Sequence, residues 1–160
     1  MTAKMPLPRP SSPTDAVNRL RIDDPTYVQC DLSRNAVLQT AKSLVPQLCE
    51  ALACNTRCRE LSLVGCQLDD SACESLSLVL RSNSTLTSLN LEENRVNNAG
   101  AQLLADALCE NAGLVALNLL NQRGTQPAYG DATLAACEPT ALRTYGDATL
   151  AACEPTALRT

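Results

Sequence analysis

The 160-residue chain contains no histidine, no tryptophan and no phenylalanine, and only three tyrosines. Without histidine, the sequence offers no Ser-His-Asp or Cys-His catalytic arrangement and no histidine-ligated metal. Few aromatic rings and a formal net charge of −4 argue against a nucleic-acid partner, which requires stacking groups and positive charge. The core must be aliphatic, and 45% hydrophobic residues predict a folded domain.

Long hydrophobic runs are also absent from the sequence. No stretch approaches the ~18 consecutive apolar residues of a transmembrane helix, so we expect no membrane partner. Residues 1–13, which read MTAKMPLPRPSSP, lack the apolar segment of a secretory signal. Together these absences predict a cytoplasmic protein.

An internal repeat dominates the remaining sequence. Residues 58–85 align with residues 86–113 at a spacing of 28 residues, and the next copy opens at Leu114 on the same spacing. An earlier copy is 31 residues long, because about three residues are inserted between Val37 and Leu44. Each copy follows L-x-x-L-x-L-x-x-N/C-x-L, which is the pattern of a leucine-rich repeat.

The two halves of each repeat have different periods. Leu89 and Leu91 alternate with polar residues, which predicts a strand, whereas Ala101, Leu104 and Leu108 recur at helical spacing. We therefore predict an α/β fold, a leucine-rich repeat solenoid. It should form a right-handed βα horseshoe segment with a parallel sheet and about four repeats of 28–31 residues.

The sequence divides into three regions. Residues 1–14 hold four prolines and no periodicity, which predicts a disordered Pro-rich N-terminus. Residues 15–123 should form the repeat domain, opened by a capping helix from Ala16 to Arg21 with Asp15 as its N-cap, covering the edge of the first strand. Residues 124–160 form a degenerate tail, in which residues 129–144 are repeated without change at 145–160.

The tail should end the solenoid. If the repeat continued beyond residue 142, Asp147 would occupy a core position, where an unpaired carboxylate is too costly to bury. The solenoid should therefore stop near residue 121, or at latest at 142. The strand at 115–119 would then end the sheet without a cap, which predicts self-association through the C-terminal repeat.

The nine cysteines suggest a metal site, but their positions favour a role in the core. Only Cys54 and Cys58 have a spacing that loosely fits a zinc-binding pair. Cys30 and Cys58 occupy leucine positions of the repeat, and Cys66 occupies the position where the pattern accepts Asn or Cys. We therefore expect no metal and no cofactor.

Other polar residues have structural interpretations. The Asn94 side chain should bond to backbone groups in the turns of neighbouring coils. Asn35 and Asn121 should do the same in the first and last coils. The adjacent carboxylates at 69–70 and 92–93 lack partner groups for acid–base chemistry and should be solvated. Nothing in the sequence thus points to an enzyme.

Residues between the leucines of each strand should line the concave sheet, a surface that solenoids commonly use for binding. The candidate partner-binding residues on this face are Arg34, Arg59, Glu60, Ser62, Ser88, Asn90, Glu92, Glu93 and Asn118. The loops that connect helix to strand, at residues 55–57 and 83–85, are an alternative contact edge, and the sequence does not choose between them.

Four stretches resemble the C-terminal repeat domain of the tropomodulin and leiomodin family, within the ribonuclease-inhibitor class of leucine-rich repeats. They are residues 17–25 with their Asp-Pro turn, residues 55–63, residues 83–94 and residues 121–123. The resemblance covers residues 17–123. We expect the resemblance not to extend to the family's long N-terminal region, nor to its further repeat and final helix, where this sequence has the duplicated tail.

The resemblance implies a non-enzymatic interaction module that associates with actin at the pointed end of filaments, and hence a cytoskeletal location. The alternative is a generic leucine-rich repeat scaffold that binds another cytosolic protein through the same face. A third hypothesis, a metalloprotein or enzyme, depends on the cysteines alone.

Overall fold

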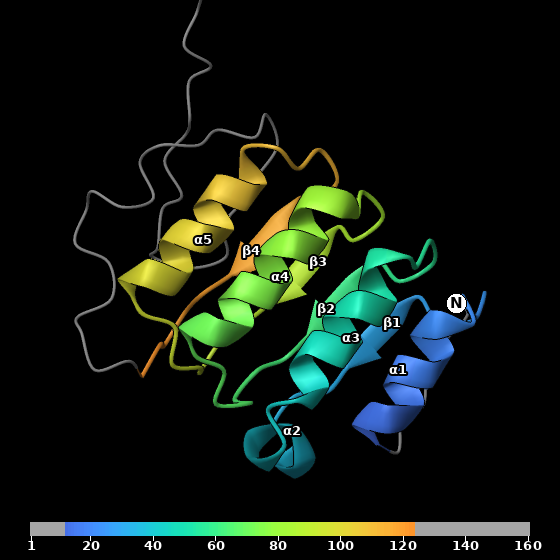
Figure 1. Ribbon diagram of the computed structural model, residues 1–160, viewed down its shortest axis with the longest axis horizontal. Helices are drawn as coiled ribbons and strands as arrows, with labels where there is room; N and C mark the ends of the chain where they lie inside the picture. Colours follow the sequence, from blue (N-terminus) through green and yellow to red (C-terminus); the bar gives the residue numbers. More distant parts are fainter. Residues whose placement is uncertain (1–11, 124–160) are drawn as a thin grey trace, which may run out of the picture.

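The computed structural model describes residues 12–123, which form a layer of helices packed on a parallel sheet (Figure 1). The strands pair in sequence order, β1-β2-β3-β4. Their bounds are β1 Gln29–Asp31, β2 Glu60–Ser62, β3 Ser88–Asn90 and β4 Ala116–Asn118. The helices are α1 Pro13–Arg21, α2 Ala36–Thr40, α3 Leu44–Ala53, α4 Asp70–Ser82 and α5 Asn98–Leu108. This arrangement confirms the predicted leucine-rich repeat solenoid.

The register of the sheet follows the repeat period. Cys30 pairs with Leu61, Leu61 with Leu89, and Leu89 with Leu117, so one position of each coil stacks on the same position of the next. The longer first repeat fits this register because its extra residues form α2, a short helix that later coils lack. In the described part of the chain, no helix is long and apolar enough to cross a bilayer.

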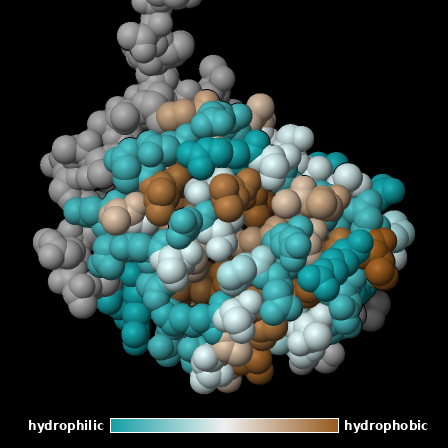
Figure 2. Space-filling view, viewed as in Figure 1, coloured by the Kyte–Doolittle hydropathy of each residue, from teal (hydrophilic) through white to brown (hydrophobic). Residues whose placement is uncertain are grey.

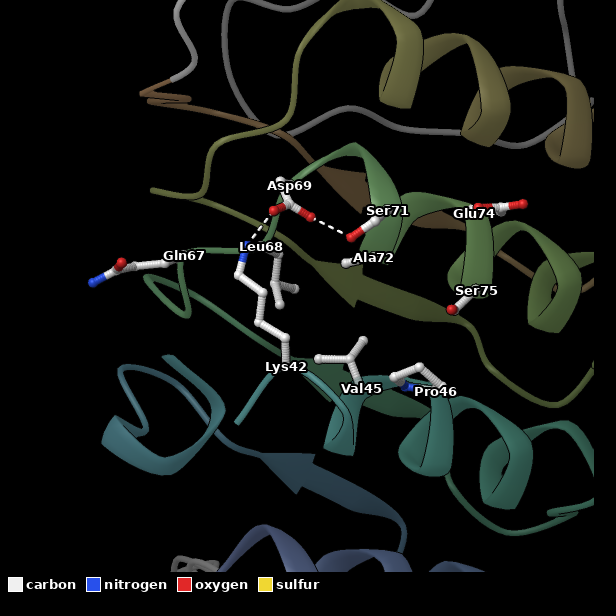
Figure 3. A pocket seen from close by; sticks show the side chains of 10 residues that line it. All are labelled: Lys42, Val45, Pro46, Gln67, Leu68, Asp69, Ser71, Ala72, Glu74 and Ser75. Atoms are coloured by element: carbon white, nitrogen blue, oxygen red, sulfur yellow. Dashed lines mark hydrogen bonds and ion pairs between the residues drawn. The ribbon is translucent and has the colours of Figure 1, made fainter. Parts of the chain in front are cut away.

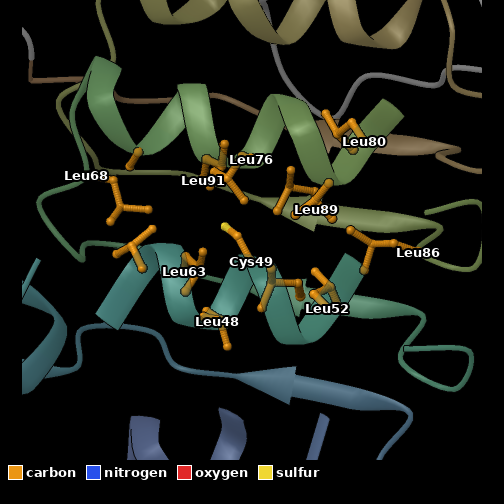
Figure 4. Close-up of a cluster of buried hydrophobic side chains, with 14 of the residues drawn as sticks. Leu48, Cys49, Leu52, Leu63, Leu68, Leu76, Leu80, Leu86, Leu89 and Leu91 are labelled. Carbon is orange, nitrogen blue, oxygen red and sulfur yellow. The ribbon is translucent and has the colours of Figure 1, made fainter. Parts of the chain in front are cut away.

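Leucines fill the space between helices and sheet, as the composition required (Figure 4). Leu52 of α3, Leu80 of α4 and Leu89 of β3 are each no more than 1% exposed. Burying one such side chain contributes roughly 1.5–3 kcal/mol to stability. Cys49 lies among the leucines and is buried with them.

The N-terminal helix differs from the predicted one in its start. It begins at Pro13 rather than Ala16, and Ser12, not Asp15, is the N-cap: the Ser12 hydroxyl accepts from the Asp15 amide at 3.1 Å. A proline at the first helical position needs no amide partner, which moves the start toward the N-terminus. Residues 12–14 are thus part of the folded domain, and residues 1–11 of the predicted disordered segment lie outside the described residues.

The same helix extends the helix layer and packs against α3 (Figure 1). Leu20 is buried in this contact, and its carbonyl accepts from the Asn55 side chain at 3.0 Å. Arg19 lies over the Tyr27 ring at 4.3 Å and pairs with Asp24 at 2.9 Å, which fixes the turn that leads to β1. The helix therefore covers the first coil by packing against α3, whereas the sequence predicted that it would cover the edge of β1.

A buried asparagine closes the turn between each helix and the following strand. Asn83 Nδ2 donates to the carbonyls of Leu52 and Asn55 at 2.7 and 3.0 Å. Its Oδ1 accepts from the amides of Thr85 and Leu86, both at 2.8 Å. One side chain thus satisfies four backbone groups, two of them in the preceding coil.

The same position repeats along the solenoid. Asn55 and Asn111 stand 28 residues on either side of Asn83, are also buried, and make corresponding bonds. We call Asn55, Asn83 and Asn111 the asparagine ladder. In the loops at 55–57 and 83–85, which the sequence offered as an alternative contact edge, the asparagine side chains are thus buried and not exposed to a partner.

A second set of side chains links the coils at the other end of the strands. Asn94 Nδ2 donates to the Leu63 carbonyl at 2.9 Å, as predicted. Cys66, one coil earlier, directs its thiol to the Leu32 carbonyl at 3.1 Å, and Gln122, one coil later, donates to the Leu91 carbonyl at 2.8 Å. In the second, third and fourth coils, the position that accepts Asn or Cys therefore supplies a donor to the preceding coil.

Two asparagine predictions at this end were wrong. Asn35 belongs to the first coil, which has no preceding coil to bond, so its Oδ1 instead accepts from Val37 and Leu38 amides and caps α2. Asn121 is exposed and donates to Glu92 at 3.0 Å, because the coil-linking role falls to Gln122. The duplicated tail at 124–160 lies outside the described residues. The predicted end of the solenoid there and the predicted self-association stay predictions.

The asparagine ladder makes the first testable prediction. Replacing Asn83 with Ala should lower the free energy of unfolding by about 3 kcal/mol, because buried backbone groups in two coils lose their partners. Urea unfolding followed by circular dichroism measures the change. Exposed Ser84 in the same turn supplies the control, and S84A should stay within about 0.5 kcal/mol of the parent. Equal losses in both variants would contradict the ladder's role.

Candidate binding surface on the sheet and at the strand ends

The outward side chains of the four strands form two polar rows across the sheet. The register places Glu60 beside Ser88 in one row, and Ser62, Asn90 and Asn118 side by side in the other. Arg59 immediately precedes β2 and is exposed. These six candidate residues, which we call the sheet face, are therefore brought together on one surface.

Polar groups on this surface largely satisfy one another. Gln29 donates to the Glu60 carboxylate at 2.6 Å, and the hydroxyls of Ser33 and Ser62 lie 2.8 Å apart. The Asn90 and Asn118 side chains accept from the amides of the residues two positions further on, which ends each strand in a turn. The sheet face is thus a polar, pre-ordered surface without an aromatic anchor.

Arg34, Glu92 and Glu93 lie in the turns beyond the strands, not on the strands as their spacing suggested. Arg34 and Glu93 have φ values of 54° and 56°, which is a left-handed conformation. Each strand is only three residues long, so the turn begins sooner than the alternating pattern implied. Glu92 still contacts the sheet face, since Asn118 donates to it at 3.2 Å.

Arg34 crosses an entire coil to reach Glu93. The guanidinium lies 3.0 Å from the Glu93 carboxylate, and the path runs over Gly65 of the intervening coil. Gly65 also has a left-handed conformation, with φ of 63°, and a Cβ there would lie 3.0 Å from Arg34 Cγ. A glycine at this position therefore permits both the turn and the ion pair above it.

A pocket of about 250 Å³ opens at this end of the strands. We call it the strand-end pocket; its lining residues are Arg34, Gln39, Gly65, Gln67, Glu93, Arg95 and Arg123. Gln39 is held in place by its bond to the Gly65 carbonyl at 2.9 Å. Sequence reasoning identified Arg34 and Glu93 as candidates but missed the other polar residues. The available signal was the 28-residue spacing of Gln67, Arg95 and Arg123.

The helix face carries a separate groove between α3 and α4. Near the helix starts, a hollow of about 270 Å³ is crossed by an ion pair between Lys42 and Asp69 (Figure 3). Hydrogen bonds from Lys42 and then Ser71 lower the pKa of Asp69. Further along, Leu78 is 63% exposed, and hydrophobic patches lie among hydrophilic side chains on this face (Figure 2).

Three of the cysteines in the described residues are buried thiols of low reactivity, whereas Cys54 is exposed. Burial raises the pKa of the Cys30, Cys49 and Cys73 thiols to about 12, so they are not nucleophilic thiolates at neutral pH. Within residues 12–123, no group of three or more His, Cys, Asp or Glu side chains is placed to hold a metal ion. The described surface offers polar and charged groups that suit non-covalent binding.

Comparison with known proteins gives one consistent family. The sequence model of the "TMOD/LMOD Leucine-rich domain" family matches residues 12–136. Human (Homo sapiens) Tropomodulin-4 is 32% identical over 116 residues, which cover 72% of this chain and 33% of the relative. Leiomodin-2 of Gallus gallus is 30% identical over 118 residues, covering 74% of this chain and 21% of the relative. The chain thus spans a third or less of these relatives' length.

Solved structures agree with the sequence comparisons. A structure titled "Leiomodin-1 Actin-Binding Site 2 (ABS2)" superposes with a TM-score of 0.69 at 26% identity, covering 75% of this chain and 66% of that one. The tropomodulin C-terminal domain of Caenorhabditis elegans gives a TM-score of 0.67 at 22% identity, covering 76% and 71% respectively. The second likeness shows the shared fold.

The crossing of Arg34 over Gly65 can be tested by a double-mutant cycle. G65A should lower the free energy of unfolding by about 1–2 kcal/mol, because the added Cβ strains the turn and displaces Arg34. In an R34A background, G65A should lower the free energy of unfolding by less, because the Arg34 side chain that the new Cβ would displace is absent. Urea unfolding measures both values, and an equal cost in the two backgrounds would contradict the crossing.

Thiol exposure gives a further prediction. In the folded protein, iodoacetamide should label exposed Cys54 and leave buried Cys30, Cys49 and Cys73 unmodified until denaturant is added. Peptide mass mapping reports each site. The C54S variant is the control and should leave the other three protected. Rapid native labelling of Cys49 or Cys73 would show that the core is not packed as described.

Proposed function

Because this chain belongs to the tropomodulin/leiomodin family of leucine-rich domains, we propose that it is a non-enzymatic protein-binding module that associates with actin filaments at their pointed end. The observation that carries the proposal is the agreement between the family match over residues 12–136 and the likeness to a structure titled as a leiomodin actin-binding site. A cytoplasmic, cytoskeletal location follows from this proposal.

We assign the contact to the sheet face together with the adjoining turns that hold Arg34, Glu92 and Glu93. Several polar side chains there are already ordered by bonds to neighbouring residues, which limits the entropy lost on binding. The described part of this surface has no Trp, Tyr or Phe, the residues besides Arg that usually dominate binding energy. Affinity should therefore depend on charge and shape over a broad area.

A generic scaffold role for another cytosolic protein is the second candidate. The same ordered polar surface favours it, because solenoids with unrelated partners present such sheets. The two candidates differ in the partner and share the surface, so one set of variants tests both.

Actin binding provides the test of the first candidate. The full chain should co-sediment with actin filaments and slow elongation at pointed ends in a pyrene-actin assay. Unchanged elongation at high micromolar protein, with no co-sedimentation, would reject actin as the partner and leave the scaffold role.

The surface assignment needs a variant that preserves net charge. Exchanging charges on the sheet face, as in R59E/E60R, should weaken actin binding about tenfold, or ~1.4 kcal/mol. The matched control is R81E/E110R on the helix side, where the pair lies 3.2 Å apart and both side chains are exposed to solvent. That control should bind like the parent. Equal losses in the two variants would contradict the sheet face as the contact.

A further inference from the structure

We propose that the strand-end pocket binds the carboxylates of an acidic, extended segment of the partner protein. The inference rests on the proposed binding function, to which it adds a second, charge-selective contact beside the sheet face. Its basis is an unbalanced group of arginines in an otherwise acidic chain.

The pocket concentrates positive charge. Three guanidinium groups, from Arg34, Arg95 and Arg123, face one carboxylate, from Glu93, in a chain whose formal net charge is −4. Glu93 is already paired with Arg34 at 3.0 Å. Arg95 and Arg123 are exposed and form no ion pair with any residue in the range 12–123. Two charges are therefore available to a ligand.

The repeat sets the spacing of these two charges. Arg95 and Arg123 occupy the same position in consecutive coils, and neighbouring parallel strands lie about 4.8 Å apart. Their backbone amides donate to the Leu68 and Asn94 carbonyls, both at 2.7 Å, which holds the two residues in register. In an extended segment, side chains on one face recur about every 7 Å. Because arginine side chains are long, the guanidiniums of neighbouring coils can spread apart to reach two such side chains.

The geometry favours carboxylates over phosphate. Phosphate sites in proteins usually include free backbone amides, but the amides of Gly65, Arg95 and Arg123 are all bonded to carbonyls. The guanidinium groups are therefore the main donors left to bind a ligand, and their planar fork matches a carboxylate in two parallel hydrogen bonds. The Glu93 carboxylate on the wall also disfavours a doubly charged anion.

A labelled acidic octapeptide of alternating Asp and Gly gives a direct probe, measured by fluorescence anisotropy with the full chain. The matched probe replaces each Asp with Asn. We expect the acidic peptide to bind and the neutral peptide to bind at least tenfold more weakly. Binding should fall as salt rises, since it depends on exposed charges.

Charge-reversal variants locate the site. R95E/R123E should weaken binding of the acidic peptide at least tenfold. The control R21E/R81E changes net charge equally, but on helix ends away from the pocket, and should stay within about twofold of the parent. Thermal melts by circular dichroism confirm that both variants fold. Equal losses in the two variants, or none in R95E/R123E, would overturn the proposal.

Two further arms separate the alternatives. Inorganic phosphate should displace the peptide no better than chloride at equal ionic strength; selective displacement would identify a phosphate site and overturn the carboxylate assignment. Actin co-sedimentation with R95E/R123E separates this inference from the proposed function. If the parent fails to bind actin but binds the peptide through the pocket, the actin proposal fails and the pocket stands. If the parent binds actin but not the peptide, the pocket proposal fails alone.

Discussion

Each turn that joins a helix to the next strand has exposed residues, such as Thr56 and Ser84, around one buried asparagine. The backbone amides and carbonyls on the inner side of the turn need partners. The asparagine ladder satisfies them, and each rung also bonds the coil before it. Stability is thereby coupled from coil to coil, because a lost side chain would leave polar groups unpaired in two coils at once. The leucine core supplies most of the burial energy, but the ladder fixes the period at which coils stack.

A fixed period has a functional consequence, since any side chain repeated every 28 residues forms a column across the solenoid. Before the strands, such a column is the asparagine ladder. After the strands, one column consists of residues in the left-handed conformation, Arg34, Gly65, Glu93 and Asn121. A second column, two residues further on, contains Gln67, Arg95 and Arg123. The periodicity that builds the core thus also assembles the strand-end pocket from residues far apart in the sequence.

Sequence reasoning identified the repeat, the strand and helix halves and most of the buried leucines, because each depends on local spacing. It failed where a residue's role depends on its neighbours in space. Asn35 occupies the right position but has no preceding coil to bond, and Arg34 and Glu93 lie beyond strands that end after three residues. The sheet-face residues were found by alternation, whereas Arg95 and Arg123 were missed because no strand pattern marks a turn.

The division of charge explains why two contact regions are consistent with one binding module. On the sheet face, Glu60, Ser62 and Asn118 are held by bonds to neighbouring strand and turn residues, so a partner there gains shape complementarity and loses little ordering entropy. In the pocket, by contrast, the guanidiniums of Arg95 and Arg123 form no ion pair within the described residues. Unpaired exposed charge adds little to folding but accelerates encounter with an oppositely charged partner and fixes its orientation. The strand-end pocket would then determine which partner binds, and the sheet face would supply most of the contact area.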